Sequence, residues 1–124
     1  AADQVLVPVE AHVMALNGLA QLLDTVETVR DRLNEELRLL GIVACRLDAR
    51  TRHGPEVEGE LRRRFPRDTM RTVIRENVRL AEAPSFGQPI TTYATKSAGA
   101  ADYRALAGEF LKRWKNKQRK REKA

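Results

Sequence analysis

The sequence predicts an α/β fold, a parallel sheet with flanking helices, and three observations support this prediction. Short, nearly continuous apolar runs lie at residues 4–9, 39–45 and 73–74. Runs of this kind are typical of parallel strands that are buried on both faces. Segments with helical periodicity separate the runs, and alternating strands and helices indicate parallel pairing. At 124 residues the chain fits one domain or a piece of one.

The first two strands are each followed by a segment that can form a helix. After residues 4–9, apolar side chains recur at steps of three, four and seven, which predicts a helix over 15–33. After residues 39–45 comes a polar loop at 46–54, and Pro55 suits the first turn of the next helix. The third strand is the short run Val73–Ile74.

Residues 75–97 are predicted to form a long loop. Pro84, Gly87 and Pro89 are spaced too closely for a helix or a central strand. A structureless connection of this length is more often functional than passive in a compact domain. It would also leave the carboxyl end of a strand, where open α/β sheets bind their ligands.

Ser97 can cap a last helix, whose apolar side chains recur on one face. We expect this stripe to pack in the core rather than to form a platform for stacking bases. Its members are Tyr103, Leu106, Ala107, Phe110, Leu111 and Trp114.

The net charge of +6 is concentrated at the C-terminus. Of the 23 Lys and Arg, eight lie in residues 112–124 together with one of the 17 acids, which leaves 15 basic and 16 acidic residues elsewhere. No apolar run approaches the length of about 18 residues that a membrane span needs. The start of the chain has no signal-peptide pattern. The single Cys45 lies in an apolar run and is expected to be a buried structural thiol in a reducing cytoplasm.

Several familiar catalytic and metal-binding motifs do not occur in the sequence. There is no GxxxxGK[ST] phosphate loop, no GxGxxG and no GxSxG, and one Cys with two distant His gives no metal-ligand spacing. His12 follows the end of a strand and could therefore face a site, but we expect it to be a surface or partly packed histidine. The chain is therefore unconvincing as an independent enzyme.

Two polar turns, 46–54 and 75–85, follow neighbouring strands of the expected sheet. Asp48 and Asn77, with exposed backbone groups, could hydrogen-bond an adenine edge or a ribose. Ordinary loop polarity explains the same residues, and the chemistry of the residues leaves both interpretations open.

Three stretches carry a resemblance to a known family: VLVPVEAHVMALNGLAQLLDTV (5–26), GIVACRLDART (41–51) and TVIRENVRLAEAPSFGQPI (72–90). They resemble the second half of the chromosome-partitioning ATPases of the ParA/Soj type, relatives of MinD. The similarity runs from about residue 2 to residue 111, and RENVRLAEAPSFGQPI is its most specific part. It implies a partial P-loop NTPase-like, doubly wound domain that lacks its N-terminal half. Residues 1–111 would belong to the ATPase domain, and 112–124 would form a helical or disordered basic tail.

The resemblance also implies roles for single residues. Candidate contacts to the nucleotide base are Arg46, Asp48, Arg75, Glu76 and Asn77. Asn77 matches the family pattern, whereas Arg75-Glu76 stand where many relatives carry Pro-Arg. Arg50 and Arg79 match arginines implicated in binding DNA without sequence preference. The basic tail could contact DNA, or it could serve only solubility.

For the whole protein, the resemblance implies a cytoplasmic, nucleoid-associated ATPase that segregates a chromosome or a plasmid. It would bind ATP and Mg²⁺, form a homodimer with ATP, and act with non-specific DNA and a ParB-like partner, without a membrane. This chain lacks the Walker A and Walker B motifs, so it should neither bind nucleotide tightly nor hydrolyse ATP alone. The sequence is also compatible with two other functions: a non-catalytic DNA-binding module that uses the tail, and a MinD-like positioning ATPase. The latter is disfavoured because no amphipathic helix follows Trp114.

Overall fold

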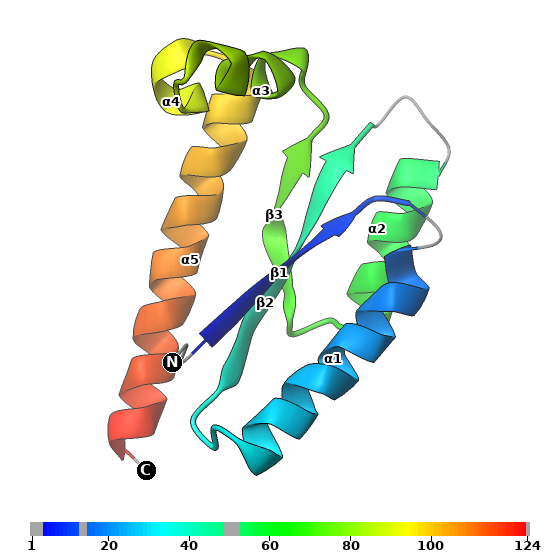
Figure 1. Cartoon of the computed structure of the whole chain (residues 1–124), viewed down its shortest axis with the longest axis vertical. Coiled ribbons are helices and arrows are strands. Elements are labelled where there is room, and N and C mark those ends of the chain that lie inside the picture. The colour runs from blue at the N-terminus through cyan, green and yellow to red at the C-terminus, as the bar shows by residue number, and fades with distance from the viewer. Residues whose placement is uncertain (1–3, 13–14, 49–52, 124) are drawn as a thin grey trace.

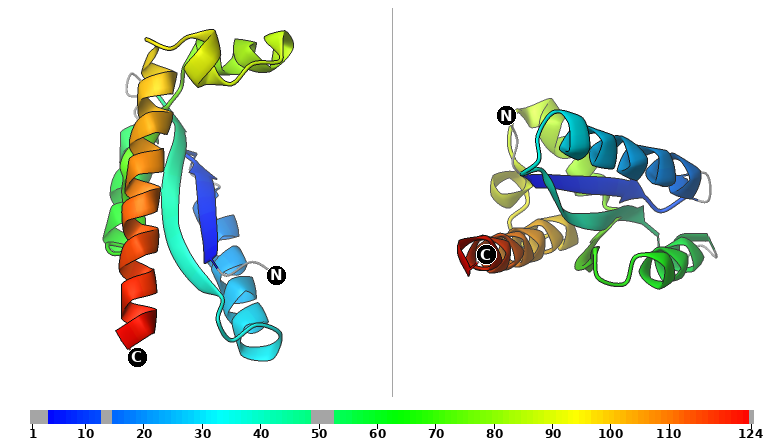
Figure 2. Two further views of the ribbon diagram at one scale, coloured as in Figure 1. Left: turned by 90° about the vertical axis from the view of Figure 1, so that its left-hand side faces the viewer. Right: turned by 90° about the horizontal axis from the view of Figure 1, so that it is seen from below.

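The computed structural model describes residues 4–12, 15–48 and 53–123, in which helices cover both faces of a three-stranded parallel sheet (Figures 1 and 2). The strands β1 (Gln4–Glu10), β2 (Arg38–Leu47) and β3 (Thr69–Arg75) lie in the order β1-β2-β3. The helical elements are α1 (Ala15–Arg32), α2 (His53–Arg64), α3 (Val78–Glu82), the 3₁₀ turn η1 (Ala83–Phe86), α4 (Ile90–Tyr93) and α5 (Ala98–Lys123). The predicted fold class is confirmed.

The apolar run of β2 is continuous because both faces of this strand are buried. Ile42 belongs to the core cluster that contains Leu19 of α1 and Leu61 of α2. The next residue, Val43, belongs to a second cluster on the opposite face, where Phe110 of α5 packs. Successive side chains of a strand point to opposite faces, so two helical layers require apolar residues at every position.

The strands are longer than their apolar runs predict. β1 continues to Glu10, which pairs with Cys45, and β2 includes Arg46 and Leu47. β3 begins at Thr69 rather than at Val73. Strand pairing uses backbone groups, so it extends into polar residues that an apolar pattern does not reveal.

The prediction of a structureless loop at 75–97 is wrong, because the breakers in this segment mark the ends of short helical turns. Asn77 caps α3 by accepting a hydrogen bond on Oδ1 from the Arg79 N–H at 2.9 Å. Pro84 occupies the start of η1, and Gly87 ends it with φ at 63°. Proline is tolerated in a first turn, and glycine readily adopts positive φ. The segment forms a compact cap at the end of α5 (Figure 1).

The last helix begins as expected but turns part of its apolar stripe to solvent. Ser97 Oγ accepts a hydrogen bond from the Ala100 N–H at 3.1 Å. Leu106 and Phe110 pack against the sheet. Tyr103, Leu111 and Trp114 remain 42%, 52% and 40% exposed, and Ala107 is also exposed, so the prediction that the whole stripe is core is wrong for these four.

Charged side chains take up much of the sheet-facing side of α5. Glu109 accepts hydrogen bonds from the backbone N–H groups of Arg71 and Thr72, each at 2.8 Å. Arg113 donates to the carbonyls of Leu40 at 3.3 Å and Thr69 at 3.0 Å. The helix thus satisfies backbone groups of the sheet, which an apolar side chain could not do. Residues 112–123 continue this helix without a break.

Candidate functional site

The two polar turns predicted to form a site lie side by side at one edge of the sheet. Leu47, the last residue of β2, is in register with Arg75, the last residue of β3. The Glu76 N–H donates to the Leu47 carbonyl at 2.9 Å, which extends the pairing by one residue. Asp48 and Asn77 therefore leave the sheet from adjacent positions at the carboxyl ends of parallel strands, as the sequence predicts.

Arg46 has an unusual backbone conformation next to this edge. Its φ is 54°, and it is the only non-glycine residue with positive φ among those the structure describes. Its guanidinium forms an exposed ion pair with Glu10 at the end of β1, with 3.3 Å between Nη1 and Oε1. A left-handed non-glycine residue is held by its surroundings at a cost of about 1–3 kcal/mol, and such residues cluster at functional sites. Through this ion pair, the Arg46 guanidinium and the end of β1 lie next to the edge that carries the two polar turns.

The side-chain amide of Asn77 has an oxygen that stabilises the start of α3 and an NH₂ group that can donate hydrogen bonds. Its Oδ1 caps α3, and its backbone carbonyl accepts from the Leu80 N–H at 3.1 Å. The side-chain NH₂ is the part of this amide that could donate to a ligand. A carboxylate such as that of Asp48 can accept several hydrogen bonds at once, so this edge combines a donor with an acceptor, which is the pattern needed to recognise a polar ring edge.

The Arg75 side chain turns away from this edge toward α5. Its guanidinium forms a fork with Asp102, with Nη2–Oδ1 at 2.8 Å and Nε–Oδ2 at 3.1 Å. The hydrogen bonds and the charge of Asp102 raise the pKa of Arg75. Sequence reasoning missed Asp102, which is only 8% exposed. Asp102 lies four residues before Leu106, and residues at this spacing share one face of a helix. This spacing is the feature of the sequence from which its position on the packed face of α5 could have been predicted.

The structure describes only one of the two arginines that are predicted to bind DNA. Arg50 lies outside the described residues. Arg79 is exposed at the start of α3 and pairs with Glu82 at 3.3 Å. Glu82 also accepts a hydrogen bond from the Tyr93 hydroxyl at 2.7 Å, which raises the pKa of Tyr93. Arg79 is therefore an exposed cation whose charge is partly balanced.

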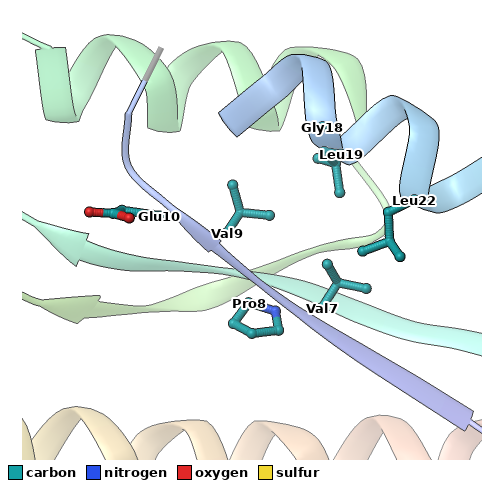
Figure 3. Close-up of a pocket in the computed structure, with 7 residues that line it drawn as sticks. All are labelled: Val7, Pro8, Val9, Glu10, Gly18, Leu19 and Leu22. Carbon is teal, nitrogen blue, oxygen red and sulfur yellow. The ribbon is translucent and has the colours of Figure 1, made fainter. Parts of the chain in front are cut away.

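The structure also contains an apolar hollow that is separate from the paired turns. A cavity of about 200 Å³ lies between β1 and α1, lined by Val7, Val9, Leu19 and Leu22 among others (Figure 3). It opens along β1, not between β2 and β3. Within the ranges that the structure describes, no three His, Cys, Asp or Glu side chains gather as a metal site. None of the described helices is long and apolar enough to cross a membrane.

Comparison with known proteins places this geometry in a family. A family model described as an AAA domain matches residues 1–39. The chromosome-partitioning ATPase Soj of Thermus thermophilus is 51% identical over 113 residues, which cover 91% of this chain and 45% of that protein. The sporulation initiation inhibitor protein Soj of Bacillus subtilis is 46% identical over 88% of this chain and 43% of its own length. The chain belongs to the ParA/Soj family.

A solved structure from Mycobacterium smegmatis resembles the fold of this ParA/Soj chain. It is described as a cobyrinic acid a,c-diamide synthase with bound ATP analogue and magnesium. It is 28% identical, with a TM-score of 0.69 over 92% of this chain and 39% of that protein. The chain thus spans less than half the length of these relatives.

Proposed function

We propose that this chain is the part of a ParA-type ATPase that supplies one side of the nucleotide base pocket. The observation that carries the proposal is the pairing of Leu47 with Arg75, which puts Asp48 beside Glu76 and Asn77. Adenine presents both a donor and an acceptor on its polar edge, and Asp48 with the Asn77 NH₂ would complement them. Arg46 would lie at the rim of the pocket as a cation. The names of the relatives support an ATPase, and the related solved structure binds an ATP analogue with magnesium.

In the complete protein, ATP and Mg²⁺ would be the cofactors, and the phosphate-binding and hydrolytic groups would come from outside this chain. A homodimer with ATP bound, a ParB-like partner and a place on the nucleoid in the cytoplasm are parts of the same proposal. We expect the 124-residue chain to show no ATP turnover on its own.

The base pocket can be tested by nuclear magnetic resonance on the isotope-labelled chain titrated with ATP and Mg²⁺. Without the phosphate contacts we expect weak binding, with Kd of about 1–10 mM. The backbone amide signals of Asp48, Glu76 and Asn77 should move, while those of Arg71 and Thr72, farther from the turn along β3, should not. Inorganic tripolyphosphate, which has no base, should leave all five signals unmoved.

Asn77→Asp is the sharpest variant, because it keeps an oxygen to cap α3 and replaces the NH₂ donor with a charged acceptor, and its control adds the same charge elsewhere. We expect it to weaken ATP binding about tenfold or more, since a lost hydrogen bond near a carboxylate is worth over 1 kcal/mol. Asn34→Asp is the matched control: Asn34 Oδ1 accepts from the Glu36 N–H at 3.1 Å in the turn between α1 and β2. Shifts confined to other parts of the chain, or equal effects of both variants, would contradict the base pocket.

A second candidate function is binding of DNA without sequence preference, in which Arg50 and Arg79 would take part. The observation that favours it is a basic face on α5. Lys112, Lys115 and Arg119 are exposed and follow steps of three and four, so they share one side of the helix. A row of cations on one helix face can neutralise successive phosphates.

A further inference from the structure

The end of β3 is held by a nearly buried carboxylate on α5. Asp102 accepts the backbone N–H of Arg75 on Oδ2 at 2.9 Å and the Arg75 guanidinium on both oxygens. One side chain thus fixes both the backbone and the side chain of the last residue of the strand. Bidentate Arg–carboxylate pairs combine charge with fixed geometry, so this contact restricts direction as well as distance.

The turn that follows is held on its other side by the same helix. Asn77 caps α3, and Leu80 of α3 packs directly on Gly99 in the first turn of α5. A Cβ atom at position 99 would lie 2.7 Å from Leu80 Cγ, so only glycine permits this approach. Glu76 and Asn77 therefore form a two-residue link between two points that both rest on the start of α5.

We propose that Asp102 is the positioning residue for the base-binding turn: by fixing Arg75, it sets where Glu76 and Asn77 leave the sheet. This inference rests on the proposed base pocket. Arg75 then acts through the backbone of the turn and does not touch the nucleotide. The pairing of β2 with β3 is irregular between Ala44 and Leu47, so the ladder is interrupted just before this end. The hydrogen bonds from Arg75 to Asp102 of α5 add a second constraint on the end of β3.

The test uses the 124-residue chain with Asp102→Ala, and Asp102→Asn as the variant that preserves volume if the first does not fold. The matched control is Glu109→Gln. Glu109 lies on the same helix and binds amides of the same strand, but at Arg71 and Thr72, away from the turn. Amide hydrogen exchange and the ATP titration are measured on each variant.

We expect the Asp102 variants to speed exchange of the Arg75 and Glu76 amides at least about tenfold relative to the control, and to weaken ATP binding about tenfold. Glu109→Gln should speed exchange at Arg71 and Thr72 and leave ATP affinity unchanged, even though it also loses stability. Arg75→Gln, which removes the guanidinium fork but keeps the backbone contact, should give an intermediate loss of affinity.

The inference is overturned if the Asp102 variants leave the exchange of Glu76 unchanged, or if ATP affinity falls equally in Glu109→Gln. The second result would mean that general stability, not placement of the turn, controls binding. If ATP moves no amide of the unmodified chain, the base pocket itself fails. Exchange at Glu76 still decides in that case whether Asp102 holds the turn.

Discussion

Glu109 illustrates how single charged side chains of α5 stabilise the sheet. Its carboxylate is 16% exposed and accepts two backbone N–H groups of β3. Burial raises the pKa of Glu109, but the hydrogen bonds from Arg71 and Thr72 and the nearby Arg113 outweigh burial and lower it below its ordinary value of 4.5. The ionised form is therefore the one that the folded state prefers.

Glu109→Gln should lower the free energy of unfolding by about 1–3 kcal/mol at pH 7, because charged acceptors make the stronger hydrogen bonds. A carboxyl whose pKa is lowered by folding stabilises the fold above its unfolded pKa, and that contribution is lost as pH falls through the lower folded pKa. The difference in the free energy of unfolding between the unmodified chain and the Glu109→Gln variant should therefore become smaller below about pH 4. Denaturant titrations at several pH values measure it.

Glu60→Gln is the control for this prediction. Glu60 pairs with Arg63 and Arg64 on the surface of α2, and such pairs contribute about 0.5 kcal/mol or less. An equal loss from both substitutions at pH 7, or a difference that does not depend on pH, would contradict the role given to Glu109.

At the scale of elements, the sequence predicts the order of the strands and the long helices well, misses the short helical turns between residues 78 and 93, and predicts the faces of α5 poorly. The order follows from apolar runs, and local pattern suffices for it. The buried and exposed faces of α5 do not follow from such a pattern, because a periodic stripe shows which residues are apolar but not which side of the helix contacts the sheet. Asp102, Glu109 and Arg113 contact backbone groups of β2 and β3, contacts that no local pattern encodes. The paired turns were predictable because parallel strands end at a common edge.

The basic face of α5 gives a testable expectation at this scale. Replacing Lys112, Lys115 and Arg119 together by Gln should weaken binding to random-sequence DNA and reduce the slope of log affinity against log salt by about 0.9 per lost phosphate contact. Arg113 and Lys117 are kept, because they donate to carbonyls of the sheet. Fluorescence anisotropy at several salt concentrations measures both quantities.

Replacing Arg32, Arg63 and Arg64 by Gln removes the same amount of charge from α1 and α2 and serves as the control. If it changes the salt slope as much as the α5 variant, binding depends on net charge and not on the face. Adding Arg79→Gln to the α5 variant should reduce the slope further if the cap also touches DNA.

At the scale of the whole molecule, apolar side chains remain exposed on both helical layers. In the described residues, β1 pairs only with β2. Leu22 beside the cavity on α1 is 43% exposed. On α5, Glu109 contacts β3 and Lys117 contacts β2, whereas Tyr103, Leu111 and Trp114 lie about 120–200° around the helix from Glu109 and are exposed. Apolar patches and unpaired strand edges are surfaces that associate.

We therefore expect the isolated chain to self-associate as its concentration rises, and Leu22→Lys with Leu111→Lys to shift this association to higher concentration. Sedimentation velocity over a range of concentrations measures the effect. Leu33→Lys is the control, since Leu33 is 84% exposed at the far end of α1. Association that is insensitive to the paired substitution, or equally sensitive to the control, would show that Leu22 and Leu111 do not form the contact.

The contacts of Arg113 have a consequence for the order in which the chain folds. Its partner Leu40 lies 73 residues earlier in the sequence, and long separations of this kind slow the search for the native state. During synthesis, the start of β2 leaves the ribosome long before the helix turn that will satisfy its carbonyls. Removing about the last three turns of α5, which include Arg113, would thus leave the beginning of β2 without its final partner, and the nascent sheet would stay open to wrong pairings.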